Sequence, residues 1–313
     1  MSRYTAIELE KLAPPQIIEE LSFSAIREAM IIDFRERLPA FDAILASDPA
    51  IMLLEAAAYR ELLLRQRINN ACKANLVATA QGTDLENIVA WLGVQRVVID
   101  HGNPQANPPI PPIYESDTRL RERGQLALEG FTTAGSQGAY EFWAFEASGK
   151  VKDVDVYSPP PIMYYTDTGL VVNQPSGQVI VTVLSVDGEG IPTTELLQQV
   201  TDKLNADEVR PLTDQVIVQS PTVIHYRVEA QLYFYQGPDA LVVRQLAEDR
   251  LREYVINHHL LGHDIPLSGL YAALHQTGVQ RVVLISPTQN IIVSKQQVAY
   301  CTEIQVTLAG IDE

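Results

Sequence analysis

Residues 48–96 read DPAIMLLEAAAYRELLLRQRINNACKANLVATAQGTDLENIVAWLGVQR and contain the longest helical pattern of the chain. Asp48 is suited to cap this helix, because its carboxylate can accept hydrogen bonds from the unpaired amides of the first turn. Pro49 then suits the first helical position, where its missing N–H costs nothing. Gly82 is typical of a residue that ends a helix. The pattern predicts a helix of about 30 residues and about 45 Å in length.

Two apolar stripes run along this predicted helix at a spacing of three to four residues. Because each stripe needs a surface to pack against, the first half of the helix is expected to be buried on two sides. One interpretation is an ordinary core helix of this chain, and the other is a helix shared with a second protein. The spacing alone does not separate these two interpretations. The first stripe comprises Leu53, Ala57, Leu64, Ile68 and Ala71, and the second comprises Ile51, Leu54, Ala58 and Leu62.

Shorter helices are expected on both sides of the long one. Residues 21–38 show helical spacing, with Ser22 or Ser24 as the capping residue. After Gly82, the spacing of Thr83 and Glu86 predicts a capping box at the start of a further helix. The sequence therefore predicts a helical N-terminal region over residues 1–100.

The composition changes after this region. Residues 101–148 begin with the run HGNPQANPPIPP, whose prolines remove backbone donors and fix φ, so a proline-rich connector followed by short helices is expected. Residues 149–220 and 221–313 each mix strand and helix patterns and predict two small α+β domains of split-βαβ type. Between the first two strands, the segment from Pro159 to Pro175 predicts a surface loop or hairpin. The predicted fold class is α+β.

Charge and cysteine content restrict the possible functions. The chain carries 39 acidic and 23 basic residues, a formal net charge of -16. Such a balance repels a phosphate backbone, so nucleic-acid binding is not expected. Cys72 and Cys301 are far apart and lack metal-ligand spacing, which indicates two reduced thiols. No apolar run approaches the length of a membrane span and the N-terminus lacks a signal-peptide core, so no membrane partner is expected.

The strongest candidate for catalysis is the histidine cluster between His258 and His263. His259 and His263 are four residues apart, a spacing that places two imidazoles on one helical face for a zinc ion. The metalloprotease pattern also requires a glutamate next to the first histidine, whereas this chain has His258 and Leu260 there. Gly262 is expected to break the helix within the pair. The cluster is therefore interpreted as a solvated helix end, with a metal-dependent cell-wall hydrolase as the alternative function.

No other pattern nominates an enzyme. No glycine-rich loop fits a phosphate cradle, because Glu189 stands where backbone amides would have to approach the anion in the run DGEG. No spacing of serine, histidine and aspartate nominates a catalytic triad. The sequence predicts a protein that is not an enzyme, with no catalytic residue, no cofactor and no metal ligand.

Several blocks of the sequence resemble one known family. The run DPAIMLLEAAAYRELLLRQRINNA, followed by GTDLENIVAWLGVQR, resembles the baseplate J family of contractile phage tails. The stretch ESD at residues 115–117 and the blocks ALEGFTTAGSQGAY, LNADEVRPLTD and SGLYAALHQTGVQRVVL are also similar to that family and follow in the same order. The resemblance covers nearly the whole chain, apart from the proline-rich connector and the segment from Pro159 to Pro175.

The resemblance implies a structural role in a contractile tail or a related contractile particle. Family members form wedges of the baseplate, join wedge to wedge and wedge to hub, and rearrange to trigger sheath contraction. The implied partners are copies of the chain itself and other wedge and hub proteins, with the sheath initiator as a further candidate. The implied location is the tail baseplate of the virion, and the host cytoplasm during assembly. Because the family's N-terminal helices bundle with a partner, the predicted interface residues are Leu53, Ala57, Leu64 and Ile68.

Overall fold

The chain is described by a computed structural model of its 313 residues. The structure describes residues 7, 9–41, 47–132, 134–160, 163–166, 169–172, 177–236 and 239–311. The chain divides into two units. The helical unit comprises Thr5–Arg96 and Ser116–Gln125, and the α+β unit comprises Val97–Glu115 and Leu126–Glu313.

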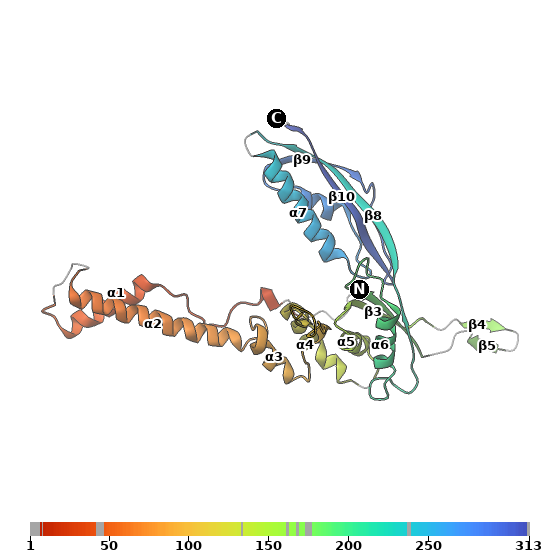
Figure 1. Ribbon diagram of the computed structural model, residues 1–313, viewed down its shortest axis with the longest axis horizontal. Helices are drawn as coiled ribbons and strands as arrows, with labels where there is room; N and C mark the ends of the chain where they lie inside the picture. Colours follow the sequence, from red (N-terminus) through yellow and green to blue (C-terminus); the bar gives the residue numbers. More distant parts are fainter. Residues whose placement is uncertain are drawn as a thin grey trace. The chain divides into compact units, whose positions relative to one another are not determined.

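The helical unit is built around a pair of helices, α1 (Phe23–Arg37) and α2 (Pro49–Ala74), with a short 3-10 turn η1 (Leu9–Lys11) before them. The predicted caps are confirmed: the Ser22 hydroxyl accepts from the amide of Ala25, and the Asp48 carboxylate accepts from the amide of Ala50. The two helices lie side by side (Figure 1) and run antiparallel. Arg27 accordingly pairs with Glu55, and Arg65 pairs with Glu19.

The end of the long helix differs from the prediction. Helix α2 spans 26 residues and ends at Ala74, with Asn75 as its C-cap, so it does not continue to Gly82. Gly82 instead opens α3 (Gly82–Ala90), where its backbone adopts a φ of 52°. The reason lies in distant residues, because the guanidinium of Arg121 donates to the carbonyls of Val77 and Ala80 and holds the segment after α2 outside a helix.

The predicted capping box is wrong. The N-cap of α3 is Gln81, and its side chain makes no capping hydrogen bond. The amide of Gly82 donates to the carboxylate of Asp117, which therefore acts as the cap. Glu86 pairs with Arg96, and Arg96 also pairs with Asp117. Because Glu86 is held by the guanidinium of Arg96, its carboxylate does not complete a capping box with Thr83.

In the α+β unit, the first sheet has the strand order β3-β6-β7. Strands β3 (Val151–Tyr157) and β6 (Gln178–Ser185) are antiparallel, whereas β6 and β7 (Gln215–Gln219) are parallel. Helix α6 (Thr194–Leu204) connects the parallel pair, and α5 (Gln137–Ala147) precedes the sheet. Their core cluster includes Tyr140, Val154, Val181, Val183, Val200 and Leu204.

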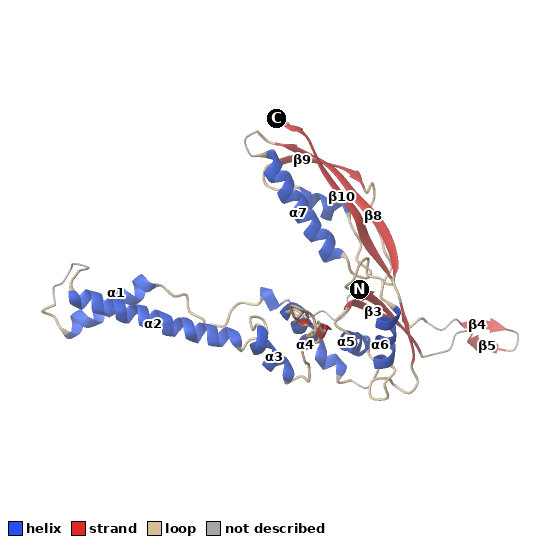
Figure 2. Ribbon diagram, viewed as in Figure 1, coloured by secondary structure: helices blue, strands red, loops and turns tan. Residues whose placement is uncertain are grey.

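The second sheet has the order β10-β8-β9. Its strands are β8 (Thr222–Phe234), β9 (Val279–Ser286) and β10 (Gln297–Ile311), where β10 is parallel and β9 antiparallel to β8. Helices α7 (Ala240–His258) and α8 (Leu267–Leu274) cover one face of this sheet (Figure 2). Their core cluster includes Val228, Ala230, Leu232, Phe234, Leu251 and Leu270.

Smaller elements complete the described chain. A two-stranded sheet pairs β1 (Val98–Asp100) with β2 (Ile113–Tyr114) across the proline-rich connector, and α4 spans Asp117–Gly130. A hairpin of β4 (Met163–Thr166) and β5 (Gly169–Val172) lies within the loop predicted between β3 and β6. Among the described residues, no helix is long and apolar enough to cross a membrane.

The α+β class with a helical N-terminal region is confirmed. One detail of the predicted topology differs: in both sheets the parallel strands are direct neighbours, so no strand separates them as in a split βαβ unit. The predicted division at residues 1–100, 101–148, 149–220 and 221–313 stays a prediction.

Candidate interaction surfaces

The most conspicuous surface of the helical unit is the face of α2 that points away from α1, here called the open face. All four predicted interface residues lie on it and are exposed, with exposed fractions of 71% for Leu53, 63% for Leu64 and 55% for Ile68. Ala57 is also exposed. Further exposed apolar side chains flank this stripe: Met52, Tyr59 and Leu63.

Among the described residues, only one side of α2 is covered by the chain itself. Of its 26 residues, Ile51, Ala58 and Asn69 are buried, and Ile51 and Ala58 belong to the second predicted stripe. The expectation of burial on two sides is therefore wrong for the chain by itself. Full burial of a leucine or isoleucine side chain stabilises a protein by about 1.5–3 kcal/mol. Contiguous exposed apolar patches are uncommon on monomeric proteins, so the open face has the character of an interaction surface.

The contact between α1 and α2 is thin. No residue of α1 is fully buried. The ion pair Arg65–Glu19 is exposed to solvent and Arg27–Glu55 is only partly buried, and such pairs near the surface contribute little. The strongest polar link is Asn69, which is 5% exposed: its amide donates to the carbonyl of Glu19 at 2.8 Å and accepts from the Glu19 backbone at 3.2 Å. The pairing with α1 therefore buries little of the apolar surface of α2. A partner on the open face would bury the apolar side chains that remain exposed there.

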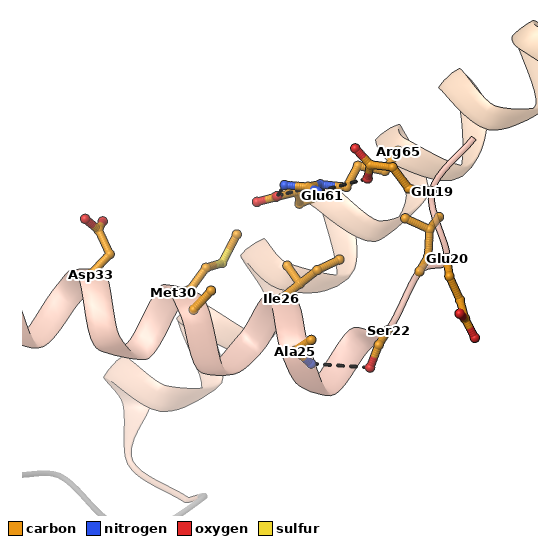
Figure 3. A pocket seen from close by; sticks show the side chains of 11 residues that line it. Glu19, Glu20, Ser22, Ala25, Ile26, Met30, Asp33, Glu61 and Arg65 are labelled. Atoms are coloured by element: carbon orange, nitrogen blue, oxygen red, sulfur yellow. Dashed lines mark hydrogen bonds and ion pairs between the residues drawn. The ribbon is translucent and has the colours of Figure 1, made fainter. Parts of the chain in front are cut away.

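A second surface feature is a groove of about 520 Å³ between α1, α2 and residues 19–22 (Figure 3). The side chains of Ile26 and Met30 project from α1 along it, as Figure 3 shows. Four carboxylates and one guanidinium line the groove, and the guanidinium of Arg65 is already bonded to Glu19 and Glu61. The groove is therefore an apolar surface with an acidic rim.

The histidine cluster lies in the α+β unit, and its members have separate surroundings. His259 is 9% exposed, and both of its ring nitrogens have partners. Its Nε2 lies 3.2 Å from the backbone carbonyl of Glu189, and its Nδ1 lies 2.9 Å from Nζ of Lys152. Because a carbonyl only accepts, Nε2 carries the proton and donates, and Nδ1 accepts from the lysine ammonium. Burial lowers the pKa of His259 and the charge of Lys152 lowers it further, and both effects favour the neutral imidazole.

The contacts of His258 and His263 also argue against a metal site in this cluster. Nδ1 of His258 donates to the carbonyl of Tyr254 at 2.9 Å, and the His258 ring stacks on Tyr254. The ring centroids of His258 and His263 are 6.4 Å apart. A metal cation at His259 would have to displace an ammonium group. Within the described part of the chain, no three histidine, cysteine, aspartate or glutamate residues converge on a metal position.

Sequence reasoning missed two partners of His259. Lys152 alternates with apolar residues on β3, a pattern that predicts a solvated side chain, and its contact with α7 joins residues 107 positions apart. The sequence analysis used Glu189 only to exclude a phosphate cradle, yet its backbone carbonyl fixes the imidazole tautomer. No short-range pattern in the sequence indicates either contact.

Comparison with known proteins identifies the family. Residues 46–103 match the baseplate J-like N-terminal domain, residues 132–220 the baseplate J-like central domain, and residues 226–307 the baseplate J-like protein C-terminal domain. Baseplate protein J of Escherichia phage P2 is 39% identical over 314 residues, which cover 98% of this chain and 99% of that protein. The chain belongs to the baseplate J-like family. The predicted resemblance is confirmed, and family membership gives the chain a structural role in the baseplate of a phage tail.

A solved assembly gives a weaker likeness. In the cryo-EM structure of the anti-feeding prophage (AFP) baseplate, one chain matches with a TM-score of 0.40 and 17% sequence identity. The match covers 62% of this chain and 44% of that chain. It is too low to support an argument about details.

The open face of α2, the groove beside α1 and the contacts of His259 lie in different places relative to the baseplate J-like domains. The open face of α2 lies wholly within the N-terminal match, whereas α1 and the acidic groove beside it begin before residue 46. Lys152 and Glu189 belong to the central domain, and His259 belongs to the C-terminal domain. The contacts of His259 therefore join two family domains within the α+β unit.

Proposed function

We propose that this baseplate J-like chain is a wedge component of a contractile tail, which holds wedge to wedge and wedge to hub. The observation that carries the proposal is the open face of α2, an apolar helix surface that its own chain leaves uncovered. Its partners are copies of the same chain and other wedge and hub proteins, with the sheath initiator as a further candidate. The chain works in the virion baseplate after assembly in the host cytoplasm.

The interface residues are Leu53, Ala57, Leu64 and Ile68, which pack into a helical bundle with the partner. Helical spacing places all four on one stripe, and each is exposed in the isolated chain. Nearby Arg60 and Arg67 are also exposed on α2. Arginines beside an apolar stripe favour a partner helix whose flanks carry carboxylates, because such flanks fix register as well as affinity.

The mechanism is mechanical. The interfaces hold the baseplate in one arrangement and repack into a second arrangement when the particle engages its host, which triggers sheath contraction. Packed interfaces support such switching because they have discrete alternative packings rather than continuous deformation.

Co-expression with the neighbouring wedge and hub genes tests the proposal. A stable complex with more than one copy of this chain, seen by native mass spectrometry, is the expected result. Leu64→Asp is expected to abolish the complex, because it places a charge in the bundle. Gln66→Asp, an exposed polar position on the same helix, is the matched control and retains it. A monomer that ignores every neighbour contradicts the proposal.

We also infer that the chain is not an enzyme. A metal-dependent cell-wall hydrolase would need His259 as a ligand, and this imidazole is engaged on both nitrogens by Glu189 and Lys152. Elemental analysis of the purified chain is expected to give far less than one zinc per chain. Stoichiometric zinc that disappears in His263→Ala would instead favour the hydrolase.

A further inference from the structure

The α+β unit contains a cavity of about 360 Å³ beside His259. Its walls come from β3, the turn after β6, the C-terminal half of α7 and the beginning of β10. The polar lining includes Lys152, Arg252 and His259, and the aliphatic lining includes Val255, Ile256 and Ile304. A volume of this size lies within the range of pockets that hold small ligands or short peptide segments.

The charge of the cavity is opposite to that of the whole chain. Lys152 and Arg252 are both cationic, and none of the residues lining the cavity carries a carboxylate. The chain as a whole has a formal net charge of -16. A wall with two cations and no anion is therefore a local exception in an acidic protein, and it favours a negatively charged occupant.

No contact ion pair with Lys152 is found among the described residues, and the carboxylate of the adjacent Asp153 favours its charged form from a longer distance. Its hydrogen bond goes to Nδ1 of His259, a neutral acceptor at 2.9 Å. The carboxylate of the adjacent Asp153 accepts from the amides of Val154 and Leu261. Burial lowers the pKa of Lys152, because the cavity wall removes water from around the charge. An ammonium has three N–H donors, so two remain for an occupant.

A half-buried ammonium that makes no contact ion pair is only partly compensated, and an anion in direct contact with it stabilises the charged form further. Arg252 already donates to Glu248 at 2.6 Å but keeps further N–H donors. The aliphatic side chains of Val255, Ile256 and Ile304 offer an apolar wall next to these donors. The combination suits a ligand with one anionic group attached to a branched aliphatic group.

We propose that this cavity binds an acidic side chain next to an aliphatic residue of a partner polypeptide. Lys152 and Arg252 contact the carboxylate, and the aliphatic wall contacts the neighbouring side chain. Because the cavity is lined from both the central and the C-terminal family domains, the bound segment ties the two domains together. The site stands independently of the open face of α2, so either can fail without the other.

Peptide titration of the full chain tests the site. N-acetyl-Val-Asp-amide is titrated against protein with labelled isoleucine and valine methyl groups, and N-acetyl-Val-Asn-amide is the uncharged control peptide. The aspartyl peptide is expected to shift the methyl signals of Ile256 and Ile304 and to bind on the order of tenfold more tightly than the control peptide, since hydrogen bonds to charged groups carry that difference.

Substitutions of single lysines test whether Lys152 binds the carboxylate of the peptide. Lys152→Gln is expected to weaken binding of the aspartyl peptide on the order of tenfold. Lys150→Gln is the matched control, because the half-exposed Lys150 does not line the cavity. Its Nζ lies 3.6 Å from Oδ2 of Asp187. Equal binding of both peptides, no effect of Lys152→Gln, or shifts confined to other methyl groups would overturn the proposal. Inorganic phosphate that binds more tightly than the peptide would also overturn it, because the site would then serve a free anion.

Discussion

Helix α2 and strand β8 are the longest helix and one of the two longest strands described, and they differ in how their apolar residues are covered. On β8, alternate residues from Tyr226 to Phe234 are buried beneath α7 and α8 of the same chain. On α2, only three of 26 residues are buried, and the stripe from Leu53 to Ile68 meets solvent. Both patterns have the regularity of a core element. The difference shows that periodicity identifies an apolar face, whereas the covering partner need not belong to the same chain.

The largest change in stability is expected for a substitution in the core below β8. Leu232→Ala removes a side chain that is 0% exposed in the core below β8. It should lower the free energy of unfolding by about 2–5 kcal/mol, because a cavity replaces the lost contacts. Leu64→Ala on the open face should change the stability of the isolated chain by less than about 0.5 kcal/mol. Urea denaturation of both variants measures the contrast. Similar losses would show that the open face is covered within the chain.

An intermediate effect is expected where α1 meets α2. Asn69→Ala deletes the amide that bonds twice to the Glu19 backbone, which should cost about 1–3 kcal/mol of local stability. Hydrogen exchange measured by mass spectrometry should show faster exchange across residues 16–37 and unchanged exchange in β8. Asn70→Ala, at the neighbouring exposed position, is the control. Unchanged exchange in Asn69→Ala would mean that the thin apolar contact suffices.

A smaller effect is expected on the pH dependence of stability, through the buried His259 of the α+β unit. His259 is faced by Lys152 from β3, by the Glu189 carbonyl and by the ring of Tyr300. Its pKa is lowered in the folded chain, so the unfolded chain binds this proton at higher pH. The free energy of unfolding should therefore fall as the pH drops below about 6.5.

Substitutions of His259 and of an exposed histidine separate the contribution of His259 to this pH dependence from that of other groups. In His259→Gln, the loss of stability between pH 7.5 and pH 5.5 should be smaller than in the parent chain, because the titrating group is gone. His275→Gln changes an exposed histidine after α8 and should keep the parent dependence. Thermal unfolding at several pH values measures both. An identical dependence in all three proteins would contradict the assignment of a neutral, buried His259.

Local chemistry accounts for most of what the sequence predicted correctly. The caps at Ser22 and Asp48 and the start of the long helix at Pro49 lie where the residue patterns placed them. These elements depend on short-range spacing and on neighbouring cap residues.

Long-range contacts account for the misses. Helix α2 ends early because Arg121 binds carbonyls more than 40 positions away, and α3 is capped by Asp117 rather than by Thr83. The cavity beside His259 depends on the contact between Lys152 of β3 and His259, the C-cap of α7, which lie 107 positions apart. Such contacts have no signature in a window of neighbouring residues. The interface role of Leu53, Ala57, Leu64 and Ile68 stays a prediction.

Photo-crosslinking in assembled particles tests the central claim most directly. The photoreactive residue p-benzoylphenylalanine is introduced as Leu64→p-benzoylphenylalanine on the open face of α2, and in a second variant at Leu212, a 99% exposed residue of the α+β unit. The account predicts that position 64 crosslinks to a second polypeptide, a copy of this chain or another baseplate protein, in particles but not in the isolated chain. Particles that assemble but give no crosslink from position 64 to a second polypeptide would contradict it, because the open face would then remain uncovered in the baseplate.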